Sequence, residues 1–388
     1  MALRVNLFCL DLLTPGVLAQ LMRACFVCCV LSLMINLSWS ADFGHATSVE
    51  RILGNAGLRP GDLPGAAVLV VKNGEVLFGH GYGVTDLRSL HQIDLHTNFR
   101  LASVTKQFTA MAIMLLVHDG KLRYDESLTE VFPEFPDYGR AITIRNLLNH
   151  TSGLQDYEDL MPPPNPKLPL EQNQIQDEDV LKLLERQSST KFVPGSRWEY
   201  SNSGYVVLGM VVQKISGQSF PDFLHDRIFA PLQMTGTVAY VRGKNEVSHR
   251  AYGHTIENGK WIETDQSPTS ATLGDGGVYS SVEDMEKWDR ALQRHTLLSA
   301  REMEPAYTPV KVAGVNEPDG TPAEYGFGWF LNPYKGHRRM WHYGETAGFR
   351  TTIQRFAGDG LTVIILCNRS DVVPAKLALQ IAELYLHK

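Results

Sequence analysis

Cysteine is scarce in this chain, and most of it lies close to the N-terminus. Four of the five cysteines fall before residue 30: Cys9, Cys25, Cys28 and Cys29. Only Cys367 remains further on, so the body of the chain cannot form a disulfide within one molecule. Cys367 ends an apolar run that starts at Leu361, and this setting predicts a buried core thiol rather than a catalytic one.

The sequence also lacks the marks of several functional classes. Its 36 Lys and Arg stand against 42 Asp and Glu, a formal charge of −6, and no basic patch points to a nucleic-acid partner. No Gly-x-Ser-x-Gly turn of the α/β-hydrolases occurs. None of the 13 histidines belongs to a His-Glu-x-x-His zinc motif, and no metal or cofactor is implied. The composition, 44% hydrophobic and 20% charged, is that of a globular protein with an ample core.

Residues 1–40 have the pattern of a targeting segment. Arg23 precedes an apolar run, residues 24–35, which has the length of a signal-peptide core and is too short to span a bilayer as a helix. Small residues around Ala41 suit cleavage, and Met22 is a candidate start of translation. We therefore expect a periplasmic or secreted protein. The alternative is an uncleaved leader, which would provide the only membrane contact that the sequence suggests.

Predicted strands gather at the two ends of the remaining chain, and predicted helices in its middle. Lys72-Asn73-Gly74 marks a hairpin turn between two apolar runs. Periodicity and turn residues predict strands over residues 66–71, 75–83, 325–331, 339–343, 351–356 and 361–367. Helices are predicted over residues 46–57, 103–118, 179–186, 204–215 and 373–386, with one more that begins at the capping residue Ser281.

This order of elements favours an α+β fold, in which an antiparallel β-sheet flanked by helices carries an inserted, mainly helical lobe. We expect residues 41–125 and 275–388 to form the sheet lobe and residues 126–274 the helical lobe. A cleft between the lobes is then the expected site. A proline-rich stretch, residues 161–170, excludes a regular helix and is expected to form a surface loop at this cleft.

The first candidate motif is Ser103-Val104-Thr105-Lys106, at the start of a predicted helix. A Ser and a Lys three residues apart share one helix face, so the amine of Lys106 would lie beside the Ser103 hydroxyl. In a dry cleft the pKa of such an amine falls and it can accept a proton. The pattern alone is weak, because Ser188-Ser189-Thr190-Lys191 matches it too. That copy precedes a Val-Pro-Gly turn and opens no helix, so we interpret it as incidental.

Two further motifs follow in the chain. In Tyr200-Ser201-Asn202, the phenol of Tyr200 could act as a base if cations stabilise its phenolate, and the Asn202 amide could orient Lys106 and bind a substrate amide. In His342-Tyr343-Gly344, at the end of a predicted strand, His342 would face the cleft and Gly344 would allow close approach of another segment. The alternatives are a plain loop before a helix and a core histidine.

In order and spacing, the three motifs resemble those of the class C β-lactamases, the D-alanyl-D-alanine peptidases and their related esterases. That family has Ser-x-x-Lys at a helix start, Tyr-x-Asn in the helical lobe, and Lys- or His-x-Gly on a strand. Three more stretches look similar: residues 147–154, 192–195 and 276–281. The resemblance covers roughly residues 45–385, and it implies the β-lactamase/transpeptidase-like fold.

The resemblance also implies a mechanism. Ser103 would attack the carbonyl of a small-molecule or peptide substrate, while Lys106 and Tyr200 handle its proton. Asn202, His342 and Gly344 would contact the substrate. The backbone N–H groups of Ser103 and Glu345 would form the oxyanion hole, in which each donor typically contributes about 10²–10³ in rate.

The third motif departs from the Lys-Thr-Gly of typical β-lactamases. Tyr343 replaces the Thr and should point to the face opposite His342. Because histidine is largely neutral near pH 7, we expect weaker capture of a substrate carboxylate. If substrate binding requires one protonation state of His342, kcat/KM should show an inflection near pH 6–7. A D-Ala peptide, a small ester and a β-lactam stay open as substrates. A non-catalytic binding protein of the same fold is the alternative function.

Overall fold

The computed structural model describes residues 44–61, 63–310 and 324–386. The expected leader, residues 1–40, and the candidate start at Met22 lie outside the described residues. The chain divides into two units, Met1–Arg51 and Ile52–Lys388, and every element discussed below belongs to the second. Among the described residues, no helix is both long and apolar enough to cross a membrane.

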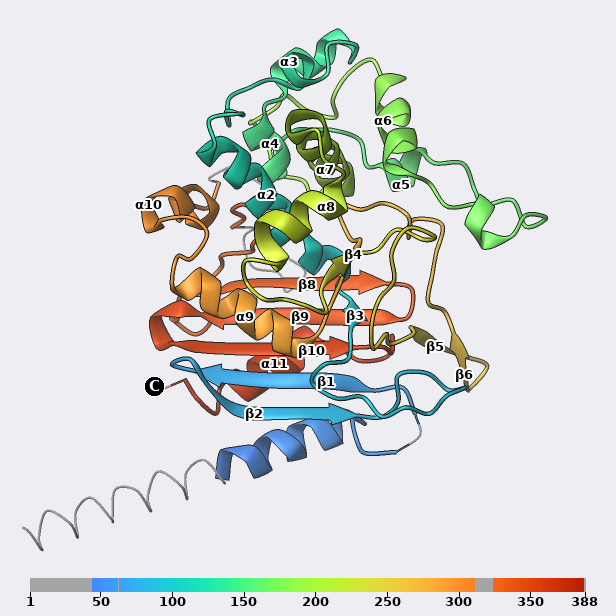
Figure 1. The fold of residues 1–388 in the computed structure, drawn as a ribbon, viewed down its shortest axis with the longest axis vertical. Coiled ribbons are helices and arrows are strands. Elements are labelled where there is room, and N and C mark those ends of the chain that lie inside the picture. Colours follow the sequence, from blue (N-terminus) through green and yellow to red (C-terminus); the bar gives the residue numbers. More distant parts are fainter. Residues whose placement is uncertain (1–43, 62, 311–323, 387–388) are drawn as a thin grey trace, which may run out of the picture. The chain divides into compact units, whose positions relative to one another are not determined.

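The second unit is organised around a five-stranded antiparallel sheet with the strand order β2-β1-β10-β9-β8 (Figure 1). Its strands come from both ends of the chain: β1 (Ala66–Lys72), β2 (Glu75–Tyr82), β8 (Met340–Thr346), β9 (Phe349–Phe356) and β10 (Leu361–Cys367). The two ends join where Ala66 of β1 pairs with Cys367 of β10. The predicted α+β class and the predicted hairpin at residues 72–74 are thereby confirmed.

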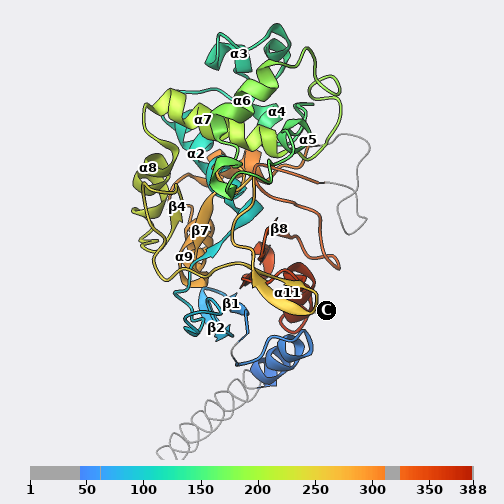
Figure 2. The same cartoon turned by 90° about the vertical axis from the view of Figure 1, so that its right-hand side faces the viewer.

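Helices cover both faces of this sheet, which explains why its middle strand β10 is mostly apolar. Figure 2 shows α9 (Val282–Gln293) and α11 (Pro374–Ala382) on opposite sides of the sheet, and both pack against β10. A strand buried on both faces favours apolar residues, and β10 is buried along its whole length with Thr362 as the polar exception; the Thr362 hydroxyl donates to Asp289. Cys367 has no exposed surface, which confirms the predicted core thiol.

The remaining elements lie between β2 and β8 in the chain. The helices are α2 (Lys106–His118), α3 (Leu128–Val131), α4 (Ile144–Leu148), α5 (Tyr157–Leu160), α6 (Asp177–Glu185), α7 (Asn202–Ser216), α8 (Phe220–Leu224) and α10 (Ala300–Met303). A three-stranded sheet holds β3 (Phe99–Arg100), β7 (Val278–Ser280) and β4 (Val238–Ala239), and a hairpin holds β5 (His254–Glu257) and β6 (Lys260–Glu263). The expected lobe boundaries stay a prediction.

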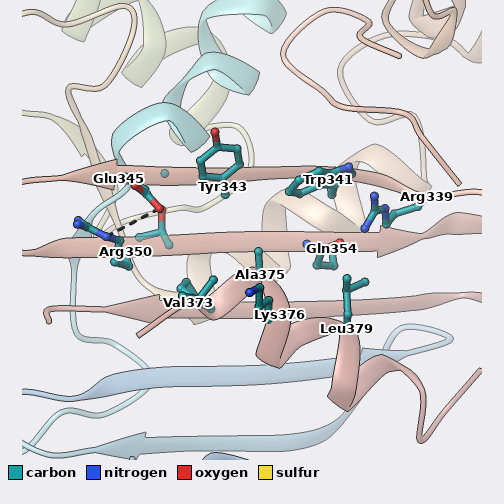
Figure 3. A pocket seen from close by; sticks show the side chains of 13 residues that line it. Arg339, Trp341, Tyr343, Glu345, Arg350, Gln354, Val373, Ala375, Lys376 and Leu379 are labelled. Atoms are coloured by element: carbon teal, nitrogen blue, oxygen red, sulfur yellow. Dashed lines mark ion pairs between the residues drawn. The ribbon is translucent and has the colours of Figure 1, made fainter. Parts of the chain in front are cut away.

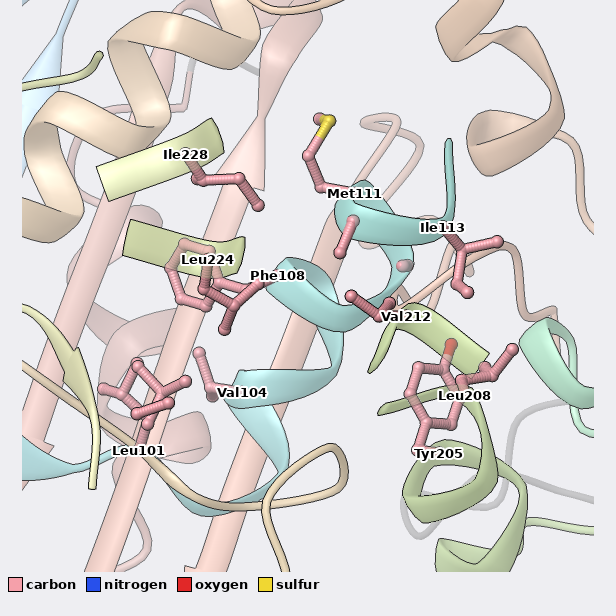
Figure 4. Packing of buried hydrophobic residues seen from close by; sticks show 14 of the residues in the cluster. Leu101, Val104, Phe108, Met111, Ile113, Tyr205, Leu208, Val212, Leu224 and Ile228 are labelled. Atoms are coloured by element: carbon pink, nitrogen blue, oxygen red, sulfur yellow. The ribbon is translucent and has the colours of Figure 1, made fainter. Parts of the chain in front are cut away.

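Helix α2 is the central element of this part. It is buried on all sides, and it packs against α7, α8 and the turn that precedes it, Ala102–Thr105. Phe108 and Leu208 have no exposed surface, and Figure 4 shows the side chains of α2, α7 and α8 that meet around them. Because α2 is buried on all sides, packing contacts hold the helix from every direction. The residues at its N-terminus therefore have a fixed position. Both Ser103 and Lys106 lie there.

Two of the local predictions are wrong in detail. Ser103 lies not in the α-helix but in a single 3₁₀ turn, Ala102–Thr105, that precedes α2. Residues 325–331 form no strand; Phe330 makes isolated bridges with Tyr325 and Trp341 instead. The reason is Gly328, whose φ of +78° turns the chain, and at which an added Cβ would lie 2.8 Å from the Lys106 carbonyl oxygen.

The predicted helix boundaries agree better where a capping residue marks them. Ser281 caps α9, with its hydroxyl oxygen 3.1 Å from the Asp284 backbone nitrogen that donates to it. Gly217 ends α7 with a φ of +75°, a conformation that glycine adopts without strain. The helix predicted over residues 373–386 is shorter, because α11 covers only Pro374–Ala382.

Candidate active site

The 3₁₀ turn that carries Ser103 is held by β7 on one side. The Leu101 backbone nitrogen donates to the Val278 carbonyl at 2.8 Å, and the Val278 backbone nitrogen donates to the Thr105 hydroxyl at 3.1 Å. Ala102, directly before Ser103, has a φ of +48°, in the left-handed region that costs free energy for a residue with a Cβ. The nucleophile candidate therefore lies on a turn that its surroundings hold in an unfavourable conformation.

Lys106 is completely buried and has an acceptor for each of its three N–H groups. Its Nζ lies 3.0 Å from Ser103 Oγ, 2.8 Å from Asn202 Oδ1 and 3.0 Å from the carbonyl oxygen of Asp275. The structure thus brings together the first two predicted motifs. It also adds the backbone of Asp275, which the sequence analysis did not single out.

Burial lowers the pKa of Lys106 to about 8, because the charged ammonium is removed from water. The negative charges of Asp275, Asp156 and Glu158 partly oppose this effect. With a pKa of about 8, roughly one amine in ten is neutral at pH 7 and able to accept a proton.

The ring of Tyr200 lies close to the same amine, with 5.0 Å between Lys106 Nζ and the ring centroid. Burial raises the pKa of the Tyr200 phenol well above its usual value, although a hydrogen bond with the Ser103 side chain lowers it somewhat. The condition for a stabilised phenolate is therefore not met in the free protein, because desolvation and next the negative charges around the site raise the pKa of the phenol. Tyr200 is a neutral hydroxyl that can donate a proton.

Asn202, the first residue of α7, has an amide whose orientation is set by its partners. Its Oδ1 accepts from Lys106, its Nδ2 donates to Glu158 Oε1 at 3.0 Å, and its backbone nitrogen donates to Asp156 Oδ2 at 2.6 Å. The geometry agrees with the expected orienting role toward Lys106. One N–H of the Asn202 amide is engaged by Glu158, and the expected contact of this amide with a substrate stays a prediction.

His342 has the environment of the core histidine that the sequence analysis gave as the alternative to a residue facing the cleft. It has no exposed surface, its Nδ1 lies 2.7 Å from the Tyr343 carbonyl oxygen, and its Nε2 lies 3.0 Å from the Tyr325 hydroxyl. Because a carbonyl only accepts, Nδ1 carries the proton and Nε2 accepts from Tyr325. Burial, and next the Lys106 charge, lower the pKa of His342 to about 3. The predicted titration of this histidine near pH 6–7 is wrong.

Gly344 provides the close approach that the sequence predicted. A Cβ at this position would lie 2.1 Å from the Leu101 carbonyl oxygen and 3.1 Å from the Ala102 Cβ, so strand β8 touches the turn that carries Ser103. Glu345 follows on β8, opposite Arg350, with an exposed carboxylate 3.9 Å from the Arg350 Nε. The oxyanion-hole role of its backbone N–H stays a prediction.

His150 is a residue that the sequence analysis missed, although it noted the stretch 147–154. Its Nδ1 accepts from the Ser201 backbone nitrogen at 3.2 Å, and its carbonyl oxygen accepts from the Glu199 backbone nitrogen at 3.0 Å. Its ring lies 4.3 Å from the ring of Tyr200, centroid to centroid. His150 therefore holds the residues on both sides of Tyr200. The signal in the sequence was a run of polar residues, Asn149 to Ser152, that proves to be buried.

The second copy of Ser-x-x-Lys opens no helix, as expected, and its Lys191 pairs with Glu199 at the surface. Within the part of the chain that the structure describes, no three His, Cys, Asp or Glu side chains are grouped so that they could hold a metal ion.

The close contact between Gly344 and the Leu101 carbonyl oxygen predicts that Gly344→Ala lowers the stability of the protein. The added methyl group must push β8 away from a backbone oxygen, and overpacking of this kind typically costs about 1–3 kcal/mol. Gly358→Ala is the matched control, because nothing lies within 4 Å of a Cβ there. Urea denaturation compares the two variants with the natural protein. Equal urea midpoints for the two variants and the natural protein would show that β8 is not in tight contact with the turn that carries Ser103.

Comparisons with known proteins agree with this geometry. Penicillin-binding protein 4* of Bacillus subtilis (strain 168) is 33% identical over 318 residues, covering 78% of this chain and 68% of that protein. The D-aminopeptidase of Brucella canis is 29% identical over 318 residues, covering 79% of this chain and 56% of that protein. The solved structure of a D-amino acid amidase from Ochrobactrum anthropi SV3, complexed with D-phenylalanine, superposes with a TM-score of 0.72 at 25% identity, covering 88% of this chain and 99% of that one.

The Beta-lactamase family model matches residues 55–386, which include all three motifs and nearly every described element. The motifs meet in space as the resemblance implied, with the Ser103, Lys106 and Asn202 side chains in direct hydrogen-bond contact. The chain belongs to the Beta-lactamase family.

Proposed function

We propose that this protein is an exported serine hydrolase that forms an acyl-enzyme on Ser103 and cleaves an amide or ester bond of a small D-amino acid derivative. The observation that carries the proposal is the buried amine of Lys106, 3.0 Å from Ser103 Oγ and with a pKa lowered to about 8. The similarity to a D-aminopeptidase and a D-amino acid amidase supports this substrate class. Export rests on the pattern of residues 1–40.

In the first step, the neutral amine of Lys106 accepts the proton of Ser103 while Ser103 Oγ forms a bond to the substrate carbonyl carbon. The carbonyl oxygen becomes an oxyanion, which the backbone N–H groups of Ser103 and Glu345 would stabilise. The turn before α2 holds the nucleophile in place, so little reorganisation accompanies the attack.

In the second step, the bond to the leaving atom breaks and that atom takes up a proton. Tyr200 is suited to deliver it, because its phenol is neutral and hydrogen-bonded to Ser103, and the Lys106 ammonium can replace the proton that it gives away. Water then attacks the acyl-enzyme with Lys106 as the base. The acid product leaves, and Ser103 regains its proton.

The neutral state of His342 bears on the substrate. A histidine with a pKa of about 3 carries no positive charge near neutral pH, so this position offers no fixed cation to a substrate carboxylate. A β-lactam, which carries such a carboxylate, gains less from this site than an uncharged amide or ester. This favours D-amino acid amides and esters over β-lactams.

Replacement of the nucleophile tests the proposal directly. Ser103→Ala should lose turnover of p-nitrophenyl butyrate and of D-alanine p-nitroanilide by about 10³-fold or more. Ser188→Ala, in the incidental copy of the motif, is the control and should keep full activity. Equal rates in both variants would contradict the site assignment. An unmodified protein that turns over neither substrate would favour a non-catalytic binding protein.

The protonation state of Lys106 predicts how kcat/KM depends on pH. Because Lys106 must lose a proton to act as the base, kcat/KM should rise tenfold per pH unit and level off near pH 8. Glu158→Gln removes a negative charge that raises the pKa of Lys106, so the midpoint should move to lower pH. His342→Gln should leave the midpoint unchanged. If kcat/KM instead shows a midpoint near pH 6–7 that disappears in His342→Gln, then His342 titrates in that range and the neutral state described above is wrong.

The contacts of His150 predict a positioning effect on Tyr200. His150→Ala removes the acceptor for the Ser201 backbone nitrogen, and the loss of such a bond should lower kcat roughly 10-fold with little change in KM. His150→Asn supplies a side-chain acceptor and tolerates the φ of +58° found here, so it should recover much of the rate. Steady-state kinetics and a melting curve on both variants separate this effect from unfolding. Equal kcat in the Ala and Asn variants would rule it out.

A further inference from the structure

The carboxylate of Glu158 is connected to the candidate nucleophile by a short chain of hydrogen bonds. Ser103 Oγ lies 3.0 Å from Lys106 Nζ, and that amine lies 2.8 Å from Asn202 Oδ1. The Nδ2 of the same amide donates to Glu158 Oε1 at 3.0 Å. The negative charge of Glu158 also acts on the Lys106 amine and on the Tyr200 phenol. Glu158 is therefore part of the candidate active site.

Two other carboxylates near the Lys106 amine are engaged within the protein. Asp156 accepts from two backbone nitrogens, that of Glu158 at 3.1 Å and that of Asn202 at 2.6 Å. Asp275 is buried, and its Oδ2 accepts from the Tyr157 hydroxyl at 3.1 Å. Neither carboxylate is both exposed to solvent and without a partner.

The exposed carboxylate of Glu345, which follows Gly344 on β8, already has a cation beside it. Figure 3 shows its ion pair with Arg350, with 3.9 Å between Glu345 Oε1 and Arg350 Nε. Glu158 differs from it. The residue is exposed, and among the described residues its carboxylate pairs with no cation and accepts only from Asn202. Its Oε2 is therefore open to a donor from solution.

The surroundings of Glu158 disfavour its negative charge. Although the side chain reaches solvent, loss of part of its hydration, and next the charges of Asp156 and Asp275, raise the pKa of this carboxyl group. The Asn202 hydrogen bond and the Lys106 charge oppose this effect only in part. A cation bound at Oε2 would stabilise the ionised form. The position is thus suited to a positively charged ligand.

The proposed substrate has a cation next to its reacting carbon. In an amino acid amide or ester, the α-nitrogen lies about 2.5 Å from the carbonyl carbon, across one tetrahedral carbon. The pKa of such an α-amine is about 8, so most of it is protonated at pH 7. When Ser103 attacks the carbonyl carbon, the ammonium group must lie among the residues that surround Ser103. Glu158 offers an open anionic oxygen there.

We propose that Glu158 binds the free α-ammonium group of the substrate, so that the enzyme selects unblocked D-amino acid amides and esters over N-acylated ones. The proposal rests on the proposed function, because it names the group beside the bond that Ser103 attacks. The ammonium replaces solvent at Glu158 Oε2, while Oε1 keeps its bond to Asn202. Glu158 then determines specificity, and it takes no part in the proton transfers.

Two p-nitroanilides that differ only in the α-amine test this selectivity at pH 7. D-alanine p-nitroanilide should react with a kcat/KM about 10–100-fold above that of propionic acid p-nitroanilide, because a hydrogen bond between charged groups contributes this much. In Glu158→Gln the ratio of the two rates should fall by about 10-fold or more. The glutamine oxygen still accepts from Asn202, so the variant removes the charge and keeps the bond.

Asp159→Asn is the matched control for the loss of one negative charge. Asp159 is the exposed neighbour of Glu158 on α5, and its variant should leave the ratio unchanged. The lower pKa of Lys106 expected in Glu158→Gln affects both substrates alike and cancels in the ratio. If Glu158→Gln keeps the ratio of the natural protein, or if Asp159→Asn lowers it equally, the proposal is overturned while the hydrolase function stands.

A blocked substrate gives a second comparison in the natural protein. The nitrogen of N-acetyl-D-alanine p-nitroanilide carries no charge, so this compound should react no faster than the propionic acid derivative. A kcat/KM equal to that of D-alanine p-nitroanilide would contradict the selection of a free ammonium group.

A binding measurement removes the dependence on turnover. In the Ser103→Ala protein, ligand-observed NMR should detect D-alaninamide, and propionamide should bind about 10-fold more weakly or less. Binding of D-alaninamide should be lost in Ser103→Ala/Glu158→Gln and kept in Ser103→Ala/Asp159→Asn. Equal binding to both double variants, or binding to neither, would overturn the ammonium site even if the anilides are hydrolysed. Binding that depends on Glu158 without turnover would support the site and contradict the hydrolase function.

Discussion

The burial of the Lys106 amine is the constraint on which the rest of this structure depends. A lone ammonium removed from water is strongly disfavoured. Either the surroundings supply an acceptor for each N–H group, or the pKa of the amine falls so that it loses its proton more readily. Here they do both: Ser103, Asn202 and the Asp275 carbonyl accept, and the pKa still falls to about 8. The helix that carries Lys106 must for this reason be fixed among segments that lie far apart in the chain.

Glycine and backbone contacts provide that fixation. The turn before α2 is tied to β7 through Leu101, and the Thr351 hydroxyl of β9 donates to the Leu101 carbonyl oxygen at 2.7 Å. Gly344 brings β8 against this turn, and Gly328 brings another segment against the first residues of α2, both at distances where a Cβ would clash. The sheet therefore acts as a support for the nucleophile as well as a core.

The two buried histidines near the site serve the same constraint in another way. Burial keeps the pKa of both His150 and His342 low, and the Lys106 charge lowers it further. Since each ring stays neutral, neither histidine adds a positive charge beside the Lys106 amine. Both rings instead form hydrogen bonds with neighbouring residues. His342 accepts from Tyr325, while His150 holds the backbone around Tyr200. In the proposed mechanism, the protons therefore move among Ser103, Lys106 and Tyr200.

The amino-acid sequence by itself determined the elements with strong local signals. The Asn-Gly hairpin, the apolar run of β10 and the Ser281 cap depend on neighbouring residues, and the motif of Ser103 and Lys106 depends on a spacing of three residues. The tertiary structure alone decided the state of each group. Burial made Tyr200 a neutral phenol and His342 a neutral spacer, and Gly328 turned a predicted strand into a loop against α2. His150 gained its importance only from contacts across the fold, because desolvation and long-range packing leave no periodic trace in the chain.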